Sequence, residues 1–203
     1  MPDLTLSAAT TAVLVADMQN DNLHPDGAFA SSGAAVHAAE QNVVANVAAV
    51  FGAARAADVS VVHNRIVAYP GRPSGGANAP IFTMIGPESL LAGTWGAASV
   101  DGVEPVGDEL VLDRIRMSAF NGTALDTVLR NWGITDVVVG VWTNMAVEYT
   151  VRDAADHGYR ATIVSDATST ISAEWQHAAL SYALTDIATD ATTAEVTQAL
   201  SAS

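Results

Sequence analysis

The sequence predicts an α/β protein of three layers, in which a doubly wound, mainly parallel sheet of six strands lies between two layers of helices. Short runs of β-branched residues alternate with longer alanine-rich segments of helical period, as in a parallel sheet covered on both faces. The regular strand-helix rhythm favours one sheet over separate domains. At 203 residues the chain is long enough for a single domain, 1–203, with a substantial core.

Each strand is expected where branched apolar residues cluster, starting with the run VLVAD that ends at Asp17. The expected strands are 12–17, 59–64, 109–114, 136–141, 160–165 and a short one at 186–189. Helices are expected where small and apolar residues recur at helical spacing. These segments are 34–57, 123–132, 144–157, 173–184 and 192–201.

Two insertions interrupt the rhythm, at 19–33 and at about 65–107, and the second contains YPGRPSGGANAP. Clusters of Gly and Pro supply turns and continue neither a strand nor a helix. A flexible surface excursion is one interpretation. A lid or an oligomer contact is favoured, because the segment carries apolar residues that need burial. They are Ile81, Phe82, Met84, Leu90, Leu91 and Trp95.

Composition excludes several classes of function. The net charge of -14 argues against nucleic acid as a partner, and no apolar run is long enough to span a membrane, so a soluble, cytoplasmic protein is expected. There is no cysteine, and all eight basic residues are arginine. The five histidines lack metal-ligand spacing, and no GxSxG, GxGxxG or phosphate-binding loop is present, so no metal and no cofactor is expected.

The candidate site lies where the strands end. In a doubly wound sheet, ligands bind at the carboxyl edge where the strand order reverses. The first strand brings Asp17 there, the third brings Arg114, and the fourth brings residues 142–146 at a helix N-terminus. A carboxyl group after a buried strand is partly desolvated and can exchange a proton near neutral pH. Arg114 stays charged and can hold a carboxylate or an oxyanion.

Structural roles are the alternatives for these residues. Asp17 could cap a helix or turn, and Arg114 could be the structural partner of a carboxylate. Asp21 is expected to cap or orient the loop that follows the first strand.

Three stretches resemble the isochorismatase-like hydrolases, the superfamily of nicotinamidases, carbamoylsarcosine amidohydrolases and isochorismatases. They are VLVADMQNDNLHPDG, LLAGTWGA and the long segment from DRIRMSAF to ATIVSDA, in family order from about 13 to 166. The resemblance implies a six-stranded parallel, Rossmann-like sheet. It also implies a catalytic aspartate, lysine and cysteine.

The chain departs from the family pattern at two of those three positions. The aspartate is Asp17, but the lysine position holds Arg114 and the cysteine position holds Ala146. An alanine cannot form a covalent acyl intermediate. An engineered cysteine-to-alanine replacement would leave the same residue, but the arginine at 114 favours natural divergence. The resemblance also implies an oxyanion hole from the backbone N–H groups of Trp142 and Ala146, with a cis peptide at Val141-Trp142.

Three functions remain open. The favoured one is a cofactor-free enzyme in which Asp17 is the general acid or base, cleaving an enol ether, ester or imine or catalysing an isomerisation. A retired hydrolase that binds a small carboxylate or aromatic metabolite is the second, and a structural subunit is the third. The substrate is expected to contact Asn22, Trp95, Trp142 and Thr143. Thr143 or Tyr149 could replace the cysteine as nucleophile, but the sequence shows no adjacent histidine to activate either hydroxyl group. A homo-oligomer, a dimer or tetramer, is expected.

Overall fold

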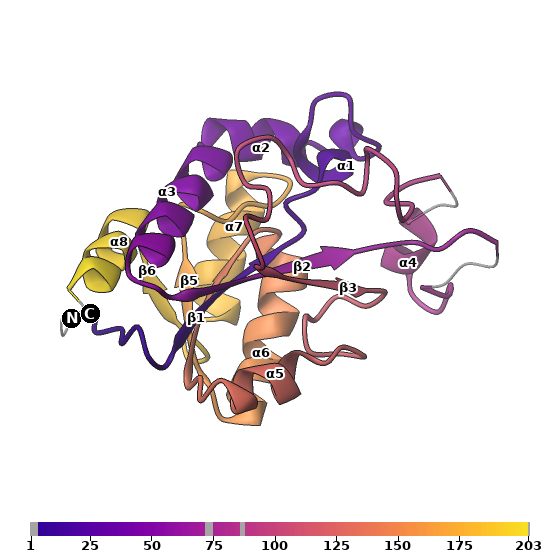
Figure 1. The fold of residues 1–203 in the computed structure, drawn as a ribbon. Helices are drawn as coiled ribbons and strands as arrows, with labels where there is room; N and C mark the ends of the chain where they lie inside the picture. The colour runs from indigo at the N-terminus through magenta and orange to yellow at the C-terminus, as the bar shows by residue number, and fades with distance from the viewer. Residues whose placement is uncertain (1–3, 72–74, 86–87, 203) are drawn as a thin grey trace.

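The computed structural model describes residues 4–71, 75–85 and 88–202 (Figure 1). The expected fold class is confirmed: six parallel strands form one sheet of order β3-β2-β1-β4-β5-β6, with helices on both faces. The strands are β1 (Thr11–Ala16), β2 (Ser60–Ile66), β3 (Leu110–Arg114), β4 (Asp136–Gly140), β5 (Arg160–Val164) and β6 (Thr189–Ala191).

The helices follow the strands along the chain. They are α1 (Asn20–Leu23), α2 (Ala34–Glu40), α3 (Val43–Ala56), α4 (Pro80–Met84), α5 (Leu125–Asn131), α6 (Glu148–His157), α7 (Ala173–Ala178) and α8 (Thr193–Ser201). Three short turns of other helix types complete the set: η1 (Ala30–Ser32), η2 (Thr143–Val147) and η3 (Ala179–Ala183). None of the helices in the described residues is long and apolar enough to cross a membrane.

Several of the expected elements differ from those observed. The helix expected at 144–157 begins as the π-helix η2 and is α-helical only in α6. The helix expected at 34–57 is two helices, because Asn42 adopts a left-handed φ of 55° that ends α2 and restarts the chain in α3. The helix expected at 173–184 is α-helical only to Ala178 and continues as the π-helix η3. The last strand lies at Thr189–Ala191, later than the expected 186–189.

The core has two parts because side chains of a strand point alternately to the two faces of the sheet. Val13 and Val15 of β1 pack under α3 and α8, together with Phe51 and Leu200. On the opposite face, Leu14 packs among residues of α5 and α6, including Leu125, Leu129 and Val151. Burying each such side chain stabilises the fold by about 1.5–3 kcal/mol.

The strand order reverses at β1. From β1 the sheet continues through β2 to β3 on one side and through β4 and β5 to β6 on the other. The carboxyl ends of β1 and β4 therefore flank the crevice in which proteins of this topology bind ligands.

The backbone is strained at this crevice. Asp17 follows β1 with a φ of 61°, and Val141 and Trp142 follow β4 with φ values of 74° and 54°. Non-glycine residues in this region each cost about 1–3 kcal/mol, and a β-branched valine there is rare. The expected cis peptide at Val141-Trp142 is wrong: the described residues contain none, and two successive left-handed residues make the turn instead.

Candidate active site

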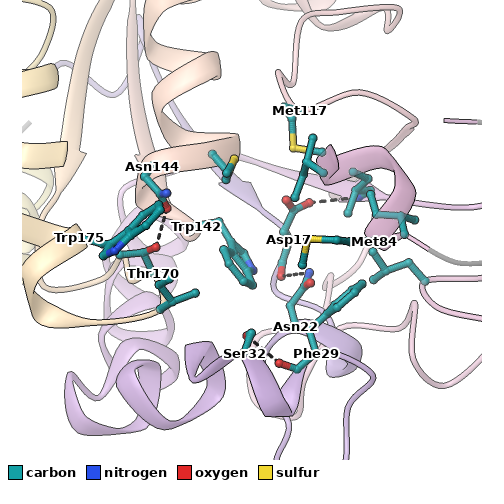
Figure 2. A pocket seen from close by; sticks show the side chains of 16 residues that line it. Asp17, Asn22, Phe29, Ser32, Met84, Met117, Trp142, Asn144, Thr170 and Trp175 are labelled. Atoms are coloured by element: carbon teal, nitrogen blue, oxygen red, sulfur yellow. Dashed lines mark hydrogen bonds between the residues drawn. The ribbon is translucent and has the colours of Figure 1, made fainter. Parts of the chain in front are cut away.

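A cavity of about 220 Å³ lies at the carboxyl ends of β1, β2 and β4. Asp17 and Trp142 reach it from the ends of β1 and β4 (Figure 2), and Ile66 lines it from the end of β2. Helices α1, α4 and α7, the turns η1 and η2 and the adjoining loops supply the rest of its wall. Most of the lining is apolar. The polar side chains that reach it are Asp17, Asn22, Ser32, Asn144 and Thr170.

Asp17 is the one ionisable residue among the described residues that line the cavity. It is only 4% exposed. Its Oδ1 accepts hydrogen bonds from Arg114 Nη2 at 2.8 Å and from the backbone N–H of Ile66 at 3.1 Å. In the described residues Oδ2 has no hydrogen-bond partner, so it is the oxygen left to carry a proton toward a ligand. Burial raises the pKa of the carboxyl group above its ordinary value and outweighs the opposing effect of the guanidinium group.

Arg114 contacts Asp17 but not the cavity. Its side chain is fully buried, and besides Asp17 it donates from Nη1 to the carbonyl oxygen of Arg116 at 2.9 Å. Arg114 Nε has no acceptor in the described residues. The guanidinium group therefore contacts the carboxyl group of Asp17 and does not contact a ligand in the cavity.

Ala146 lies in the π-helix η2 and is wholly buried. Its methyl group is absent from the cavity wall, which at this point is formed by Trp142, Asn144 and Met145. Figure 2 shows the ring of Trp142 between Asp17 and the pair formed by Asn144 and Thr170, whose side chains are joined by a hydrogen bond of 2.5 Å. The segment thus lines the cavity with no side chain able to attack a carbonyl carbon.

Thr143 and Tyr149 do not line the cavity either. Thr143 is fully buried, and its hydroxyl group is hydrogen-bonded to Thr168 and to Gln176. Tyr149 is 53% exposed on α6. The structure therefore places neither hydroxyl group where the cysteine thiol of the family would act.

Asn22 lines the cavity, as expected. Its Nδ2 donates to the backbone carbonyl oxygen of Asp17 at 3.0 Å, which fixes the left-handed turn after β1. Asp21 orients loops, also as expected: its carboxylate accepts from the N–H of Ala28 at 3.1 Å and of Leu90 at 2.6 Å.

Trp95 lies outside the cavity, contrary to expectation. It is 53% exposed, and its ring packs edge-on against His24 with 5.0 Å between centroids. The LLAGTWGA motif instead brings Leu90 to the cavity and Gly96 against Asp21. The insertion therefore contributes to the site through residues other than its tryptophan.

Sequence reasoning missed several lining residues. The role of Gln19 was also not predicted. Its Oε1 accepts from the backbone N–H of Ile66 at 3.0 Å, and its Nε2 donates to the carbonyl oxygen of Ile66 at 2.9 Å. For the lining residues of α4, the signal in the sequence was the apolar character of the insertion. Lining residues without a specific sequence signal include Phe29, Ser32, Met117, Thr170, Ile171 and Trp175. Residues 72–74 and 86–87 of the insertion lie outside the described residues.

The described residues contain no group of three or more His, Asp or Glu side chains placed to hold a metal ion. His63, the most buried histidine, is bonded to Glu109 at 2.9 Å on the edge of the sheet and does not line the cavity. The chemistry available to the cavity is therefore proton transfer by Asp17 and hydrogen bonding by neutral groups.

Comparison with known proteins agrees with this geometry. Residues 11–197 match the isochorismatase domain family. The chain belongs to the isochorismatase family. It is an isochorismatase-like hydrolase, in which the strand-end aspartate is present and the cysteine is not.

Relatives in sequence and in structure cover most of the chain. A ureidoacrylate amidohydrolase RutB from Agrobacterium fabrum is 33% identical over 179 residues, which are 81% of this chain and 78% of that protein. The crystal structure of a cysteine hydrolase from Pseudomonas syringae pv. phaseolicola superposes with a TM-score of 0.87 at 25% identity, covering 98% and 96% of the two chains. An N-carbamoylsarcosine amidase from Thermoplasma acidophilum gives 0.72 at 26% identity, covering 91% and 96%.

Proposed function

We propose that this isochorismatase-like hydrolase works without a covalent intermediate and that Asp17 transfers the proton. The observation that carries the proposal is the state of its carboxyl group. Oδ1 accepts two hydrogen bonds while Oδ2 has no partner in the described residues, and burial raises the pKa. A proton on Oδ2 is therefore available to a substrate in the cavity.

Hydrolysis then proceeds with water in place of the family thiolate. Asp17 protonates the enol ether, ester or imine and so makes a neighbouring carbon electrophilic. A water molecule adds to that carbon and returns a proton to the Asp17 carboxylate, and the adduct then releases an alcohol or an amine as its C–O or C–N bond breaks. Because no residue is acylated, alanine at 146 is compatible with turnover. An isomerisation that moves one proton would use the same group.

The amide substrates of the named relatives are not transferred to this chain. The RutB relatives are named ureidoacrylate amidohydrolases, so the bond that they cleave is an amide bond. In the described residues the cavity has neither a cysteine to attack an amide nor a cation to receive a carboxylate.

The test compares the wild-type protein with Asp17→Asn in a metabolite extract analysed by mass spectrometry. Wild type is expected to consume one compound. Hydrolysis gives two products whose masses add up to the substrate plus one water, and isomerisation gives one product of the same mass as the substrate. An asparagine at this position cannot donate a carboxyl proton, so turnover is expected to fall by about 100-fold or more, while circular dichroism shows an unchanged fold.

Full activity of Asp17→Asn would disprove the proposal. A compound that co-elutes with the wild-type protein but is never consumed would instead identify a binding protein. A matched control is Asp101→Asn, because Asp101 is exposed and remote from the cavity wall.

A further inference from the structure

The charges around the cavity restrict what it can accept. No arginine in the described part of the chain lines it, and the chain contains no lysine. Arg55, Arg65, Arg130, Arg152 and Arg160 each pair with a carboxylate elsewhere. Arg116 lies over the ring of Phe82 and donates to the carbonyl oxygen of Gly75. A bound carboxylate would therefore find no cation among these residues.

An anion would also meet unfavourable surroundings. The chain has a net charge of -14, and the one ionisable group in the described part of the wall is itself a carboxyl group. Moving a carboxylate out of water into an apolar site without a partner carries a large desolvation penalty. A cationic ligand would gain little attraction from the carboxyl group of Asp17, because Oδ1 is already hydrogen-bonded to Arg114.

Hydrogen-bond donors nevertheless remain. Trp142 lines the cavity, and its Nε1–H is buried without an acceptor in the described residues. Buried N–H groups of this kind normally have a partner. The carboxyl group of Asp17, whose pKa is raised by burial, supplies a second donor in its acid form. The rest of the wall consists largely of methionine, isoleucine and aromatic side chains, including Met84, Met117 and Trp175.

We propose that the cavity takes an uncharged, largely apolar molecule of one ring, with a carbonyl, enol-ether or imine acceptor directed at Trp142 Nε1 and Asp17. The size agrees, because a cavity of about 150 Å³ binds benzene and this one measures about 220 Å³. The inference rests on the proposed function in placing substrate in this cavity, and it adds the charge and polarity of that substrate.

Four ligands of equal size and similar shape test the charge preference at pH 7.5. Acetophenone is neutral with an acceptor, α-methylstyrene is neutral without one, benzoate is an anion and benzamidinium is a cation. Kd values are measured by titration in ¹H–¹⁵N spectra, following the indole N–H signals of the four tryptophans. Acetophenone is expected to bind at least about tenfold more tightly than either ion. It is also expected to move the Trp142 signal, which is assigned from Trp142→Phe.

The acceptor is tested by a ligand and variant cycle. In wild type, acetophenone is expected to bind about threefold or more tightly than α-methylstyrene. Trp142→Phe keeps a ring in place but removes the N–H, so this advantage is expected to shrink. The matched control is Trp132→Phe, because Trp132 is 43% exposed at the end of α5 and should leave both Kd values unchanged.

A gain of function completes the test. Met84 lines the cavity and is 58% exposed, so a lysine there can keep its ammonium group hydrated while reaching a ligand. Met84→Lys is expected to tighten benzoate binding several-fold, and unchanged benzoate binding would contradict the view that a missing cation is what excludes anions.

Benzoate or benzamidinium binding as tightly as acetophenone to wild type would overturn the inference, as would no measurable binding of acetophenone. An unchanged advantage of acetophenone over α-methylstyrene in Trp142→Phe would overturn the assignment of the acceptor. None of these ligands is hydrolysed, so the outcome is independent of turnover. If the ligand preference fails while Asp17→Asn loses activity, the proposed function stands and only the substrate class is wrong.

Discussion

Asp17 and Arg114 show what single residues of this sequence can and cannot predict. Their proximity was predictable, because both follow strands of one parallel sheet. The direction in which the side chain of Arg114 points was not predictable. It is on β3, with β2 between it and β1, so its side chain must cross about two strand spacings, roughly 10 Å, to reach Asp17. Because its length is used in covering that distance, the guanidinium group ends beneath the carboxyl group and does not reach the cavity.

Removing this guanidinium group should change the titration of Asp17. In Arg114→Met the carboxyl group keeps its burial, which raises the pKa, and loses the positive charge that opposes it. The pKa of Asp17 is therefore expected to rise further, and the pH above which the acid form is lost moves upward. The ¹³C shift of the Asp17 carboxyl carbon, followed from pH 4 to pH 10, measures this directly.

The variant should also be less stable at neutral pH, by up to about 3 kcal/mol, because Asp17 Oδ1 and the carbonyl oxygen of Arg116 each lose a buried hydrogen-bond donor. Arg152→Met is the control, since Arg152 pairs with Glu148 on the surface. A midpoint for Asp17 that is the same in all three proteins would show that Arg114 does not set its protonation.

At the scale of elements, the long strands and helices follow from periodicity, and the short ones do not. Helices α1 and α4 contain 4 and 5 residues, too few for a 3.6-residue repeat to be recognised. The break between α2 and α3 was hidden for a different reason. The break falls at the polar residues Glu40, Gln41 and Asn42, which one continuous helix could also carry on an exposed face, and only the left-handed conformation of Asn42 marks the change of direction.

Gly96 illustrates an element that depends on one absent side chain. A Cβ atom there would collide with Oδ2 of Asp21, the oxygen that accepts from the Leu90 N–H. Gly96→Ala is therefore expected to displace this carboxylate and lower the free energy of unfolding by about 2 kcal/mol. Urea titration measures the change, and acetophenone binding should weaken with it.

The contrasting variant is Gly52→Ala in α3. Nothing lies within 4 Å of a Cβ atom at that position, so alanine should stabilise the helix by up to about 1 kcal/mol. Equal effects of the two substitutions would contradict the role given to Asp21.

For the whole molecule, the doubly wound parallel sheet between two layers of helices was predictable, because short apolar strands alternate with longer helical segments in the sequence. The composition of the cavity wall was not, since it is assembled from segments that are distant in sequence and have no shared motif. Met117 comes from the loop after β3, whereas Ile171 and Trp175 come from the start of α7 and the loop before it. The expected dimer or tetramer stays a prediction.

Stability of the whole fold should decline in acid through one cluster at the sheet edge. Burial alone would raise the pKa of Glu109, but hydrogen bonds from Arg55, Val106 and His63 hold it at about 2, against an ordinary 4.5. The stabilisation is thus complete above about pH 4.5 and is lost as the pH falls toward 2. Burial lowers the pKa of His63, so protonating it in acid also costs stability.

Glu109→Gln tests this cluster. At pH 7 the variant is expected to be less stable by about 2 kcal/mol, and the difference from wild type should shrink as the pH falls from 4.5 to 2. Thermal unfolding at a series of pH values measures it, with the exposed Glu40→Gln as control. A difference that is constant with pH would mean that the charge of Glu109 is not what stabilises the edge.

The hydrogen bond from Leu90 to Asp21 links the insertion to the turn after β1. The Leu90 N–H can exchange with solvent deuterium only when this bond opens, and opening it also releases part of the cavity wall. Its exchange rate therefore reports how often the site opens transiently. A ligand held in the cavity should slow the exchange of the Leu90 N–H in proportion to its occupancy, so binding can be followed without a catalytic assay.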